Sequence, residues 1–327
     1  MRAAVITEPG GPDVLKIVEV DDPVPGPEDV LIDVKASALN RADMIQRQGN
    51  YPAPAGSPSD IPGLEFAGVV LEAGERVAGM VKGDRVFGLL GGGGYASRTI
   101  THHRMAVRIP DAWDFVQAAA TPEVFFTAYD ALFNRGNLQM GERVLVHAAG
   151  SGVGTAAVQL AHHAGAFVFG TAGSAEKLAG AAALGMDVGI NYHDQDFAEI
   201  VKEHTLGVGV DVLIDFIGAP YWNKNIASMA VLGRLVEVGL MGGSKVEVEL
   251  GQLMGKRLQV TGTGLRGRSL EEKLAVTAQF KRHVLPHLAS GSMKPVVDRL
   301  FPLEEVADAH RYMETNANFG KIILTID

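Results

Sequence analysis

The stretch VLVHAAGSGVGTAAVQLA, residues 144–161, predicts a strand, a glycine-rich turn and a helix in immediate succession. Gly150, Gly152 and Gly154 lie in the predicted turn, where the absence of side chains lets the backbone approach a bound group closely. The N–H groups and the dipole at the start of the following helix favour a negative charge. This arrangement indicates a loop that binds the pyrophosphate of a dinucleotide.

The glycine spacing departs from the strict G-x-G-x-x-G pattern, because residue 155 is threonine. The glycines alone are also compatible with an ordinary tight turn. The strand before them and the helix after them are what favour nucleotide binding.

The segment GTAGSAEK, residues 170–177, follows the next predicted strand and bears on the choice of cofactor. NAD-binding sites usually place an acidic residue about 20 residues after the glycines, to hold the ribose 2′-hydroxyl. Here Gly173 and Ser174 leave room for a 2′-phosphate, and Lys177 offers a positive charge. Glu176 projects from a different face of the helix than Lys177. The segment favours NADPH over NADH, with a solvated Glu–Lys surface pair as the alternative.

The regions around this loop predict two kinds of domain. In the middle of the chain, apolar strands alternate with helical stretches, which indicates a parallel sheet with ligands at the carboxyl ends of its strands. In the first third, short strands separated by Pro, Gly and Asp indicate a small barrel or irregular β domain.

The final part predicts a long helix over 270–288, a shorter one over 306–313 and a closing strand over 321–326. The other predicted segments are strands at 3–6, 15–20, 30–36, 68–73, 84–88, 95–100, 143–148, 167–171, 211–216 and 234–238, and helices at 154–164 and 176–184.

Composition narrows the functional classes. The chain has 327 residues, enough for two domains with separate cores. It contains no cysteine, so disulfides, thiolate nucleophiles and cysteine-ligated zinc are excluded. A net charge of -9 without a Lys/Arg run gives no expectation of nucleic-acid binding. Neither a signal peptide nor a membrane-spanning run is visible, so a soluble cytoplasmic protein is expected.

Several motifs together resemble the zeta-crystallin-like quinone oxidoreductase branch of the medium-chain dehydrogenase/reductase superfamily. Their order and spacing match this branch over essentially the whole chain. The matching segments are VKASALNRADMIQRQGNYP (34–52), IPGLEFAGVV (61–70), AAATPEVFFTAYDALF (118–133), the glycine turn, INY (190–192), DVLIDFIG (211–218), TGTGLRGRS (261–269) and the final GKIIL.

The resemblance implies an α/β protein with two domains. A GroES-like β-barrel catalytic domain would comprise residues 1–121 and 263–327. A Rossmann domain with a doubly wound parallel sheet would comprise residues 122–262 and bind NADPH. A homodimer is a further implication of the family.

The resemblance also implies where a catalytic zinc would be bound. Zinc-dependent relatives carry a cysteine near residue 38 and a Gly-His-Glu segment that corresponds to Gly63-Leu64-Glu65 in this chain. The histidine ligand is replaced by Leu64. A zinc-independent enzyme is therefore expected, and Lewis-acid catalysis loses its support.

Residue roles follow from the resemblance position by position. Asn40, Tyr51 and Glu65 would line the substrate cleft, and Thr127 would contact the nicotinamide end. Lys177 and Tyr192 would grip the 2′-phosphate. The remaining cofactor contacts would come from Gly152, Val153, Gly154, Gly173, Ser174, Gly239, Leu240, Met241, Gly264, Leu265 and Lys321.

Structural alternatives stand beside these roles. Tyr192 could close a strand, Thr127 could bond within its own helix, and Tyr51 could be a packing residue. Glu65 could be a buried structural carboxylate. Ser151 replaces a glycine that is common in this turn of the family. Five histidines lack any partner pattern and are expected to be structural or exposed: His102, His103, His147, His162 and His163.

The expected activity is hydride transfer from NADPH to a quinone, with Asn40, Tyr51 or water supplying a proton. One alternative is an NADPH-dependent enoyl or α,β-unsaturated carbonyl reductase, which needs a placed proton donor. The other is a weakly catalytic NADPH-binding protein.

Overall fold

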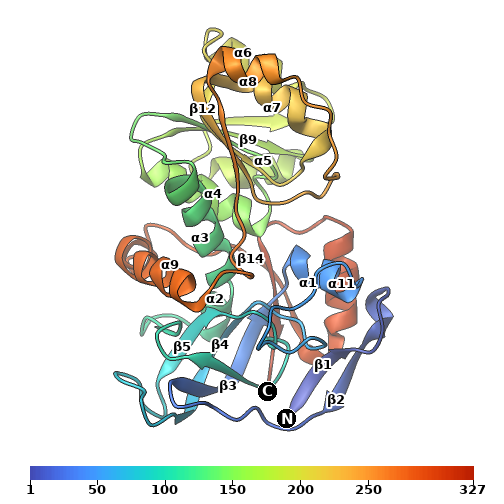
Figure 1. The fold of residues 1–327 in the computed structure, drawn as a ribbon, viewed down its shortest axis with the longest axis vertical. Coiled ribbons are helices and arrows are strands. Elements are labelled where there is room, and N and C mark those ends of the chain that lie inside the picture. Colours follow the sequence, from blue (N-terminus) through green and yellow to red (C-terminus); the bar gives the residue numbers. More distant parts are fainter. The chain divides into compact units, whose positions relative to one another are not determined.

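A computed structural model describes residues 1–327 and divides them into two compact units (Figure 1). The first unit combines Met1–Glu123 with Leu265–Asp327, and the second is Val124–Gly264. No helix in the structure is both long and apolar enough to span a membrane.

The second unit is built on a six-stranded sheet whose neighbouring strands all run parallel. The first three strands in the sequence occupy one half of the sheet in reverse order, and the last three occupy the other half. The order reverses between β8 (Arg143–Val146) and β11 (Val210–Asp215). This is the doubly wound order 3-2-1-4-5-6, which has a ligand crevice at the reversal point. In sheet order the strands are β10 (Val188–Asn191), β9 (Phe167–Ala172), β8 (Arg143–Val146), β11 (Val210–Asp215), β12 (Met229–Glu237) and β13 (Gln259–Gly262).

Short helices connect these strands, as parallel pairing requires. The central strands β8 and β11 are rich in Val, Leu and Ile and are buried nearly throughout, as expected for strands covered on both faces. The helices are α3 (Pro122–Tyr129), which leads into the unit, α4 (Gly152–His163), α5 (Ala175–Ala182), α6 (Phe197–His204), α7 (Trp222–Ser228) and α8 (Leu250–Lys256).

The first unit contains a seven-stranded sheet that joins both ends of the chain, blue and red in Figure 1. The long strand β3 (Asp29–Ala38) pairs with β4 (Glu65–Ala73) along one edge, and with β6 (Arg98–His102) and then β15 (Lys321–Thr325) along the other. β14 (Val297–Pro302) lies beyond β15, while β5 (Arg85–Leu89) and β7 (Val107–Arg108) extend the sheet from β4. A separate hairpin pairs β1 (Arg2–Ile6) with β2 (Leu15–Glu19).

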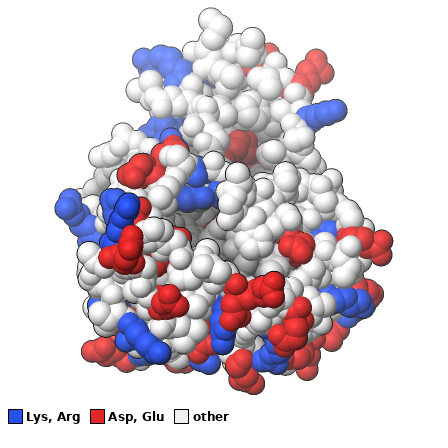
Figure 2. Space-filling model, turned by 60° about the horizontal axis from the view of Figure 1, so that its bottom comes forward, with Lys and Arg blue, Asp and Glu red and all other residues white.

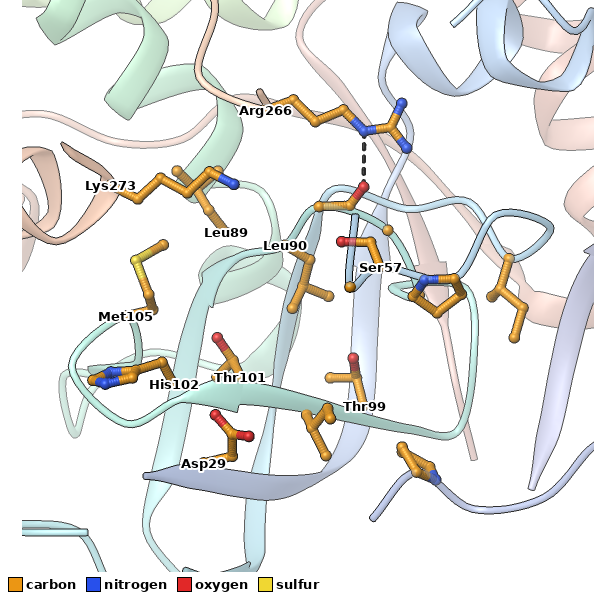
Figure 3. Close-up of a pocket in the computed structure, with 18 of the residues that line it drawn as sticks. Asp29, Ser57, Leu89, Leu90, Thr99, Thr101, His102, Met105, Arg266 and Lys273 are labelled. Atoms are coloured by element: carbon orange, nitrogen blue, oxygen red, sulfur yellow. Dashed lines mark hydrogen bonds between the residues drawn. The ribbon is translucent and has the colours of Figure 1, made fainter. Parts of the chain in front are cut away.

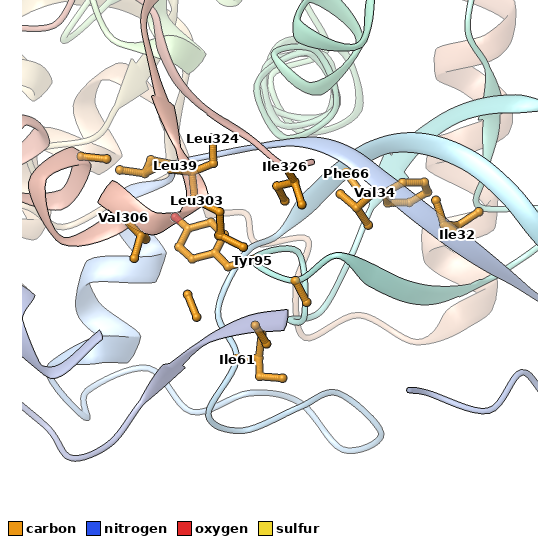
Figure 4. Close-up of a cluster of buried hydrophobic side chains, with 14 of the residues drawn as sticks. Ile32, Val34, Leu39, Ile61, Phe66, Tyr95, Leu303, Val306, Leu324 and Ile326 are labelled. Atoms are coloured by element: carbon orange, nitrogen blue, oxygen red, sulfur yellow. The ribbon is translucent and has the colours of Figure 1, made fainter. Parts of the chain in front are cut away.

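Five helices complete the first unit: α1 (Arg41–Arg47), α2 (Phe115–Ala119), α9 (Leu270–His283), α10 (Leu285–Ala289) and α11 (Val306–Glu314). Its core holds alternating residues of β3 against residues from the C-terminal segment (Figure 4). Ile32 and Val34 are fully buried in this core, as are Phe66 and Leu324. The N-terminal and C-terminal segments of the chain therefore share one hydrophobic core.

The predicted α/β class and the parallel sheet are confirmed. The helix predicted over 270–288 is wrong in one respect, because it breaks into α9 and α10 at Val284. Pro286 in the first turn of α10 has no N–H to continue the α9 hydrogen bonds. The strand predicted over 143–148 ends at Val146, because Ala148 turns to a positive φ of 48°.

The turn between β8 and α4 brings helix and strand into close contact at Gly154. A Cβ atom at this position would lie 2.2 Å from the carbonyl oxygen of Ala148, closer than any real contact. Gly154 thus has the close-packing role of the last glycine in a dinucleotide-binding turn, one position earlier than the strict pattern. Thr155 uses its hydroxyl to donate to the carbonyl of Gly152 at 2.8 Å.

Gly154→Ala should therefore push α4 away from β8 and lower the free energy of unfolding by about 1–3 kcal/mol, the usual range for overpacking. Chemical denaturation of the purified variant measures this. Gly251→Ala is the matched control, because Gly251 lies in α8 with nothing within 4 Å of its Cβ position. It should leave stability unchanged or raise it slightly, and equal destabilisation by both variants would contradict the packing argument.

Candidate functional site

The first unit contains a buried polar cluster centred on the ammonium group of Lys321. Nζ donates to Oε1 of Glu65 at 2.7 Å, to Oδ1 of Asn40 at 2.7 Å and to the carbonyl of Leu39 at 2.6 Å. Asn40 Nδ2 also donates to Glu65 Oε1 at 2.8 Å. Glu65 is fully buried and Lys321 is 3% exposed, so the pair is desolvated and each charge depends on the other.

Asp43 extends this cluster at the start of α1. Its Oδ2 accepts from the backbone N–H of Asn40 at 2.8 Å and from the Tyr95 hydroxyl at 2.8 Å, and its Oδ1 accepts from Gly63 N–H at 3.2 Å. Burial raises the pKa of Asp43 to about 6, against the lowering effect of these hydrogen bonds. The capping box that Asn40 and Asp43 form fixes the position of Asn40.

A cavity of about 470 Å³ lies in the first unit (Figure 3). Apolar side chains such as Leu89, Leu90 and Met105 line it together with a few charged groups. Glu123, Arg266 and Lys273 are among these charged groups. A cavity that combines apolar side chains with polar groups is typical of a small-molecule site.

Glu123 connects this cavity with the buried cluster. Its backbone N–H donates to Oε2 of Glu65 at 2.8 Å, while its side chain lines the cavity. Burial, and then the Glu65 carboxylate nearby, raise the pKa of Glu123 to about 8. Glu123 is therefore largely protonated at neutral pH and has a proton to donate.

Tyr51, predicted in the substrate cleft, packs against Arg266. The guanidinium carbon lies 4.8 Å from the centroid of the Tyr51 ring, and Arg266 Nη1 donates to the Tyr51 carbonyl at 3.2 Å. The structure brings Asn40 and Lys321 together. The ammonium group of Lys321, predicted to contact the cofactor, donates its hydrogen bonds to the buried cluster instead. Lys321 thus contacts Glu65 and Asn40 in this structure, a partnership that the sequence did not indicate.

In the second unit, the glycine loop lies at the carboxyl end of β8, at the reversal point of the sheet. The Ser151 hydroxyl caps α4 by accepting from Gly154 N–H at 3.0 Å, so the serine that replaces a common glycine has a defined role. The N–H groups of Gly152 and Val153 belong to the first turn, where no intrahelical acceptor exists. These groups can receive a phosphate.

The residues predicted to hold a 2′-phosphate converge beside this loop. The Lys177 stem covers Gly150, with Cγ 3.3 Å from the position of an added Cβ. The Tyr192 hydroxyl covers Gly173, 2.4 Å from its Cβ position, so any side chain at residue 173 would displace it. Ser174 caps α5 by accepting from Lys177 N–H at 3.3 Å. These five residues thus belong to one corner of the second unit.

Other predicted cofactor residues lie elsewhere in the second unit. Gly239, Leu240 and Met241 form the loop after β12, and the latter two side chains are about half exposed. Thr127 is buried in α3, and Gly264 ends the unit after β13. Leu265 belongs to the first unit, where it lines the cavity.

Glu237, at the end of β12, is a residue that the sequence did not suggest. Its Oε2 atom is buried without a hydrogen-bond partner, and burial followed by the nearby Asp215 raises its pKa to about 7. A buried carboxyl oxygen without a partner costs free energy unless a ligand satisfies it. His147, in contrast, is satisfied, with its ring nitrogens 3.0 Å from the Thr171 hydroxyl and 2.7 Å from Asn225 Oδ1.

The residues present do not fit a zinc ion. No group of three or more His, Asp or Glu side chains in the chain could hold a metal, and there is no cysteine. Leu64 is buried, and the neighbouring Glu65 is neutralised by Lys321. An ammonium 2.7 Å from that carboxylate would repel a divalent cation there.

Signals for Glu123 and Arg266 were present in the sequence, within the quoted segments 118–133 and 261–269. Lys273 carried no such signal.

On the face drawn in Figure 2, acidic and basic side chains are interspersed rather than gathered in one basic field.

Comparison with known proteins identifies the family. Residues 26–111 match the alcohol dehydrogenase GroES-like domain, and residues 152–279 match the zinc-binding dehydrogenase family. Human quinone oxidoreductase is 32% identical over the whole of this chain and 98% of its own length. Escherichia coli quinone oxidoreductase, solved in complex with NADPH, is 32% identical with a TM-score of 0.90, over 99% of this chain and 100% of that one.

The CurK enoyl reductase structure is 31% identical with a TM-score of 0.89, over 100% of this chain and 99% of that one. The similarity to quinone oxidoreductases extends over 99–100% of the chain, and both domain matches lie within it. The chain therefore belongs to the medium-chain dehydrogenase/reductase superfamily, in its quinone oxidoreductase branch.

Proposed function

We propose that this protein is an NADPH-dependent reductase that transfers hydride to quinones without a zinc ion. The observation that carries the proposal is the corner formed by Lys177, Tyr192, Gly173 and Gly150 in the second unit. It combines a positive charge and a hydroxyl next to a helix N-terminus suited to a pyrophosphate. The NADPH complex of the related Escherichia coli enzyme supports the same cofactor here.

The proposed 2′-phosphate site lacks the acidic residue with which NAD-binding sites usually hold the ribose 2′-hydroxyl. No acidic side chain ends β9, where such a residue would hold a 2′-hydroxyl, and Gly173 and Ser174 stand in its place. Glu176 belongs to the exposed first turn of α5, on a different face from Lys177. Glu237, with its unpartnered buried oxygen, is a further candidate to accept from a cofactor hydroxyl.

When bound, the cofactor supplies the hydride, and the protein has to position it and exclude water. Gly152, Val153 and Gly154 would hold the pyrophosphate. The nicotinamide end would contact Thr127, the 239–241 loop, Gly264 and Leu265. The role predicted for Lys321 changes in this proposal, because its ammonium holds Asn40 and Glu65 in fixed positions.

Zinc independence is part of the proposal. It rests on the unsuitable donor set around Leu64 and Glu65 and on the Lys321 ammonium in that cluster. The substrate, a quinone, accepts hydride without metal assistance. We also propose the domain limits 1–121 with 263–327 and 122–262, a homodimer and a cytoplasmic location.

A second activity, reduction of enones, is favoured by Glu123. The enolate left after hydride transfer to the β-carbon must gain a proton at the α-carbon. Glu123 supplies a protonated carboxyl group at the wall of an apolar cavity. The similarity to the CurK enoyl reductase supports the same activity.

The purified protein should oxidise NADPH in the presence of quinones and should prefer NADPH to NADH. Lys177→Ala removes the proposed charge on the 2′-phosphate and should raise the Kd for NADPH about 10- to 100-fold, with little change for NADH. Calorimetric titration with both cofactors measures this. Lys202→Ala, at an exposed position of α6, is the matched control.

Preference for NADH, or equal effects of the two lysine substitutions, would refute the 2′-phosphate site. Tight NADPH binding without turnover of any quinone or enone would instead identify the protein as a weakly catalytic NADPH-binding protein.

Dialysis against a strong chelator should leave the rate of quinone reduction unchanged, because no suitable zinc ligands are present. Steady-state kinetics before and after treatment, together with elemental analysis, test this. Loss of activity that zinc restores would overturn zinc independence.

Glu123→Gln should lower kcat for enones by about 10²- to 10⁴-fold, the usual contribution of a general acid. Quinone reduction should fall much less, because the reduced quinone can gain its protons from water. In the unmodified protein, enone turnover should fall as the pH rises through about 8, where Glu123 loses its proton. A profile without this limb, or equal losses on both substrate classes, would show that Glu123 is not the acid.

A further inference from the structure

The charged groups that line the cavity of the first unit differ in whether they have partners (Figure 3). Arg98 forms an ion pair with Asp22, and Asp29 accepts from the N–H of Gly26 at 3.0 Å. Arg98 is therefore neutralised, and Asp29 lies on the side of the cavity away from Arg266 and Lys273 (Figure 3). Arg266, Lys273 and Glu123 are not paired with any opposite charge.

Arg266 is 6% exposed and is held rigidly by neutral acceptors. Nε donates to the carbonyl of Gly91 at 2.8 Å, and Nη2 donates to Oε1 of Gln46 at 2.6 Å. With the bond to the Tyr51 carbonyl, three of its five N–H groups are used. None of these acceptors carries a charge. Asp43 and Glu123 favour the charged form of the guanidinium from a distance, but neither forms an ion pair with it.

Lys273 lies in the first turn of α9, along the same edge of the cavity as Arg266 (Figure 3). The residue is half-buried, and its ammonium group makes no hydrogen bond or ion pair. Burial, and then the positive charge of Arg266, lower the pKa of Lys273. A cation in the first turn of a helix is also disfavoured by the helix dipole. Two cations that repel each other in a partly buried place are costly unless an anion binds between them.

The carboxyl group of Glu123 is not the anion that compensates Arg266 and Lys273. No ion pair within 4 Å joins it to Arg266 or to Lys273, and its own surroundings favour the protonated form. At neutral pH the cavity therefore has two positive charges and no compensating negative one at this edge. A substrate group has to supply it.

We propose that this cavity selects hydride acceptors that carry an anionic oxygen group, a carboxylate or a sulfonate, and that Lys273 and Arg266 bind this group. The proposal rests on the proposed reductase function and specifies its substrate class. Arg266 offers a fixed planar donor, and Lys273 a mobile point charge. Leu89, Leu90 and Met105 on the remaining cavity wall suit the ring or chain of the acceptor.

A matched pair of quinones tests the proposal: 1,2-naphthoquinone-4-sulfonate and the neutral 1,2-naphthoquinone. The KM for the sulfonate should be clearly the lower of the two. Lys273→Met should raise that KM about tenfold, the effect of losing one charge-assisted hydrogen bond, and leave the KM for the neutral quinone unchanged. Arg282→Met, at an exposed position of the same helix, is the control and should change neither value.

A redox-inert pair, 2-naphthoate and 2-naphthamide, separates binding from turnover. Calorimetry should show tighter binding of the naphthoate, and this advantage should disappear in Lys273→Met. If naphthoate binds in this way but no quinone is turned over, the anion site stands and the reductase function fails. If both quinones are reduced with equal KM values that Lys273→Met does not change, the function stands and the anion site is refuted.

Discussion

The contact between Lys321 and Glu65 is the constraint on which the first unit depends. Lys321 opens β15, Glu65 opens β4, and Leu39 and Asn40 follow β3, so one ammonium group joins three strand ends. A buried charge without its partner costs several kcal/mol, which makes these positions mutually dependent. The same carboxylate accepts the N–H of Glu123 in the first turn of α3.

Much of the fold could be predicted from the sequence because its physical signals are local. Apolar runs such as that of β8 and the glycines after it identify a parallel sheet and its ligand loop. Sequence patterns do not identify an element whose formation depends on packing against distant parts of the chain. β14 has mostly exposed or half-buried side chains and pairs with β15, so its sequence VDRLFP shows no strong alternation. The break before α10 depends on a single proline.

The candidate site was less predictable, because its residues meet over long sequence separations. Asn40 and Glu65 could be named from family motifs, but their link to Lys321 spans 281 and 256 residues. Glu123 and Lys273 each lie in the first turn of a helix, where charged residues are commonly solvated. Only the enclosing cavity distinguishes them from surface charges. Ser151, which replaces a glycine common in this turn of the family, proves to be the cap of α4.

The strand β15 has a consequence for the synthesis of the chain. The second unit is one continuous segment, Val124–Gly264, so the ribosome releases all of it before the first unit has its C-terminal part. Domains generally fold as units during synthesis. Until the last residues emerge, β3 lacks its partner β15, and an apolar core and an unpaired edge remain exposed. During this interval a chaperone would have the largest exposed apolar surface to cover.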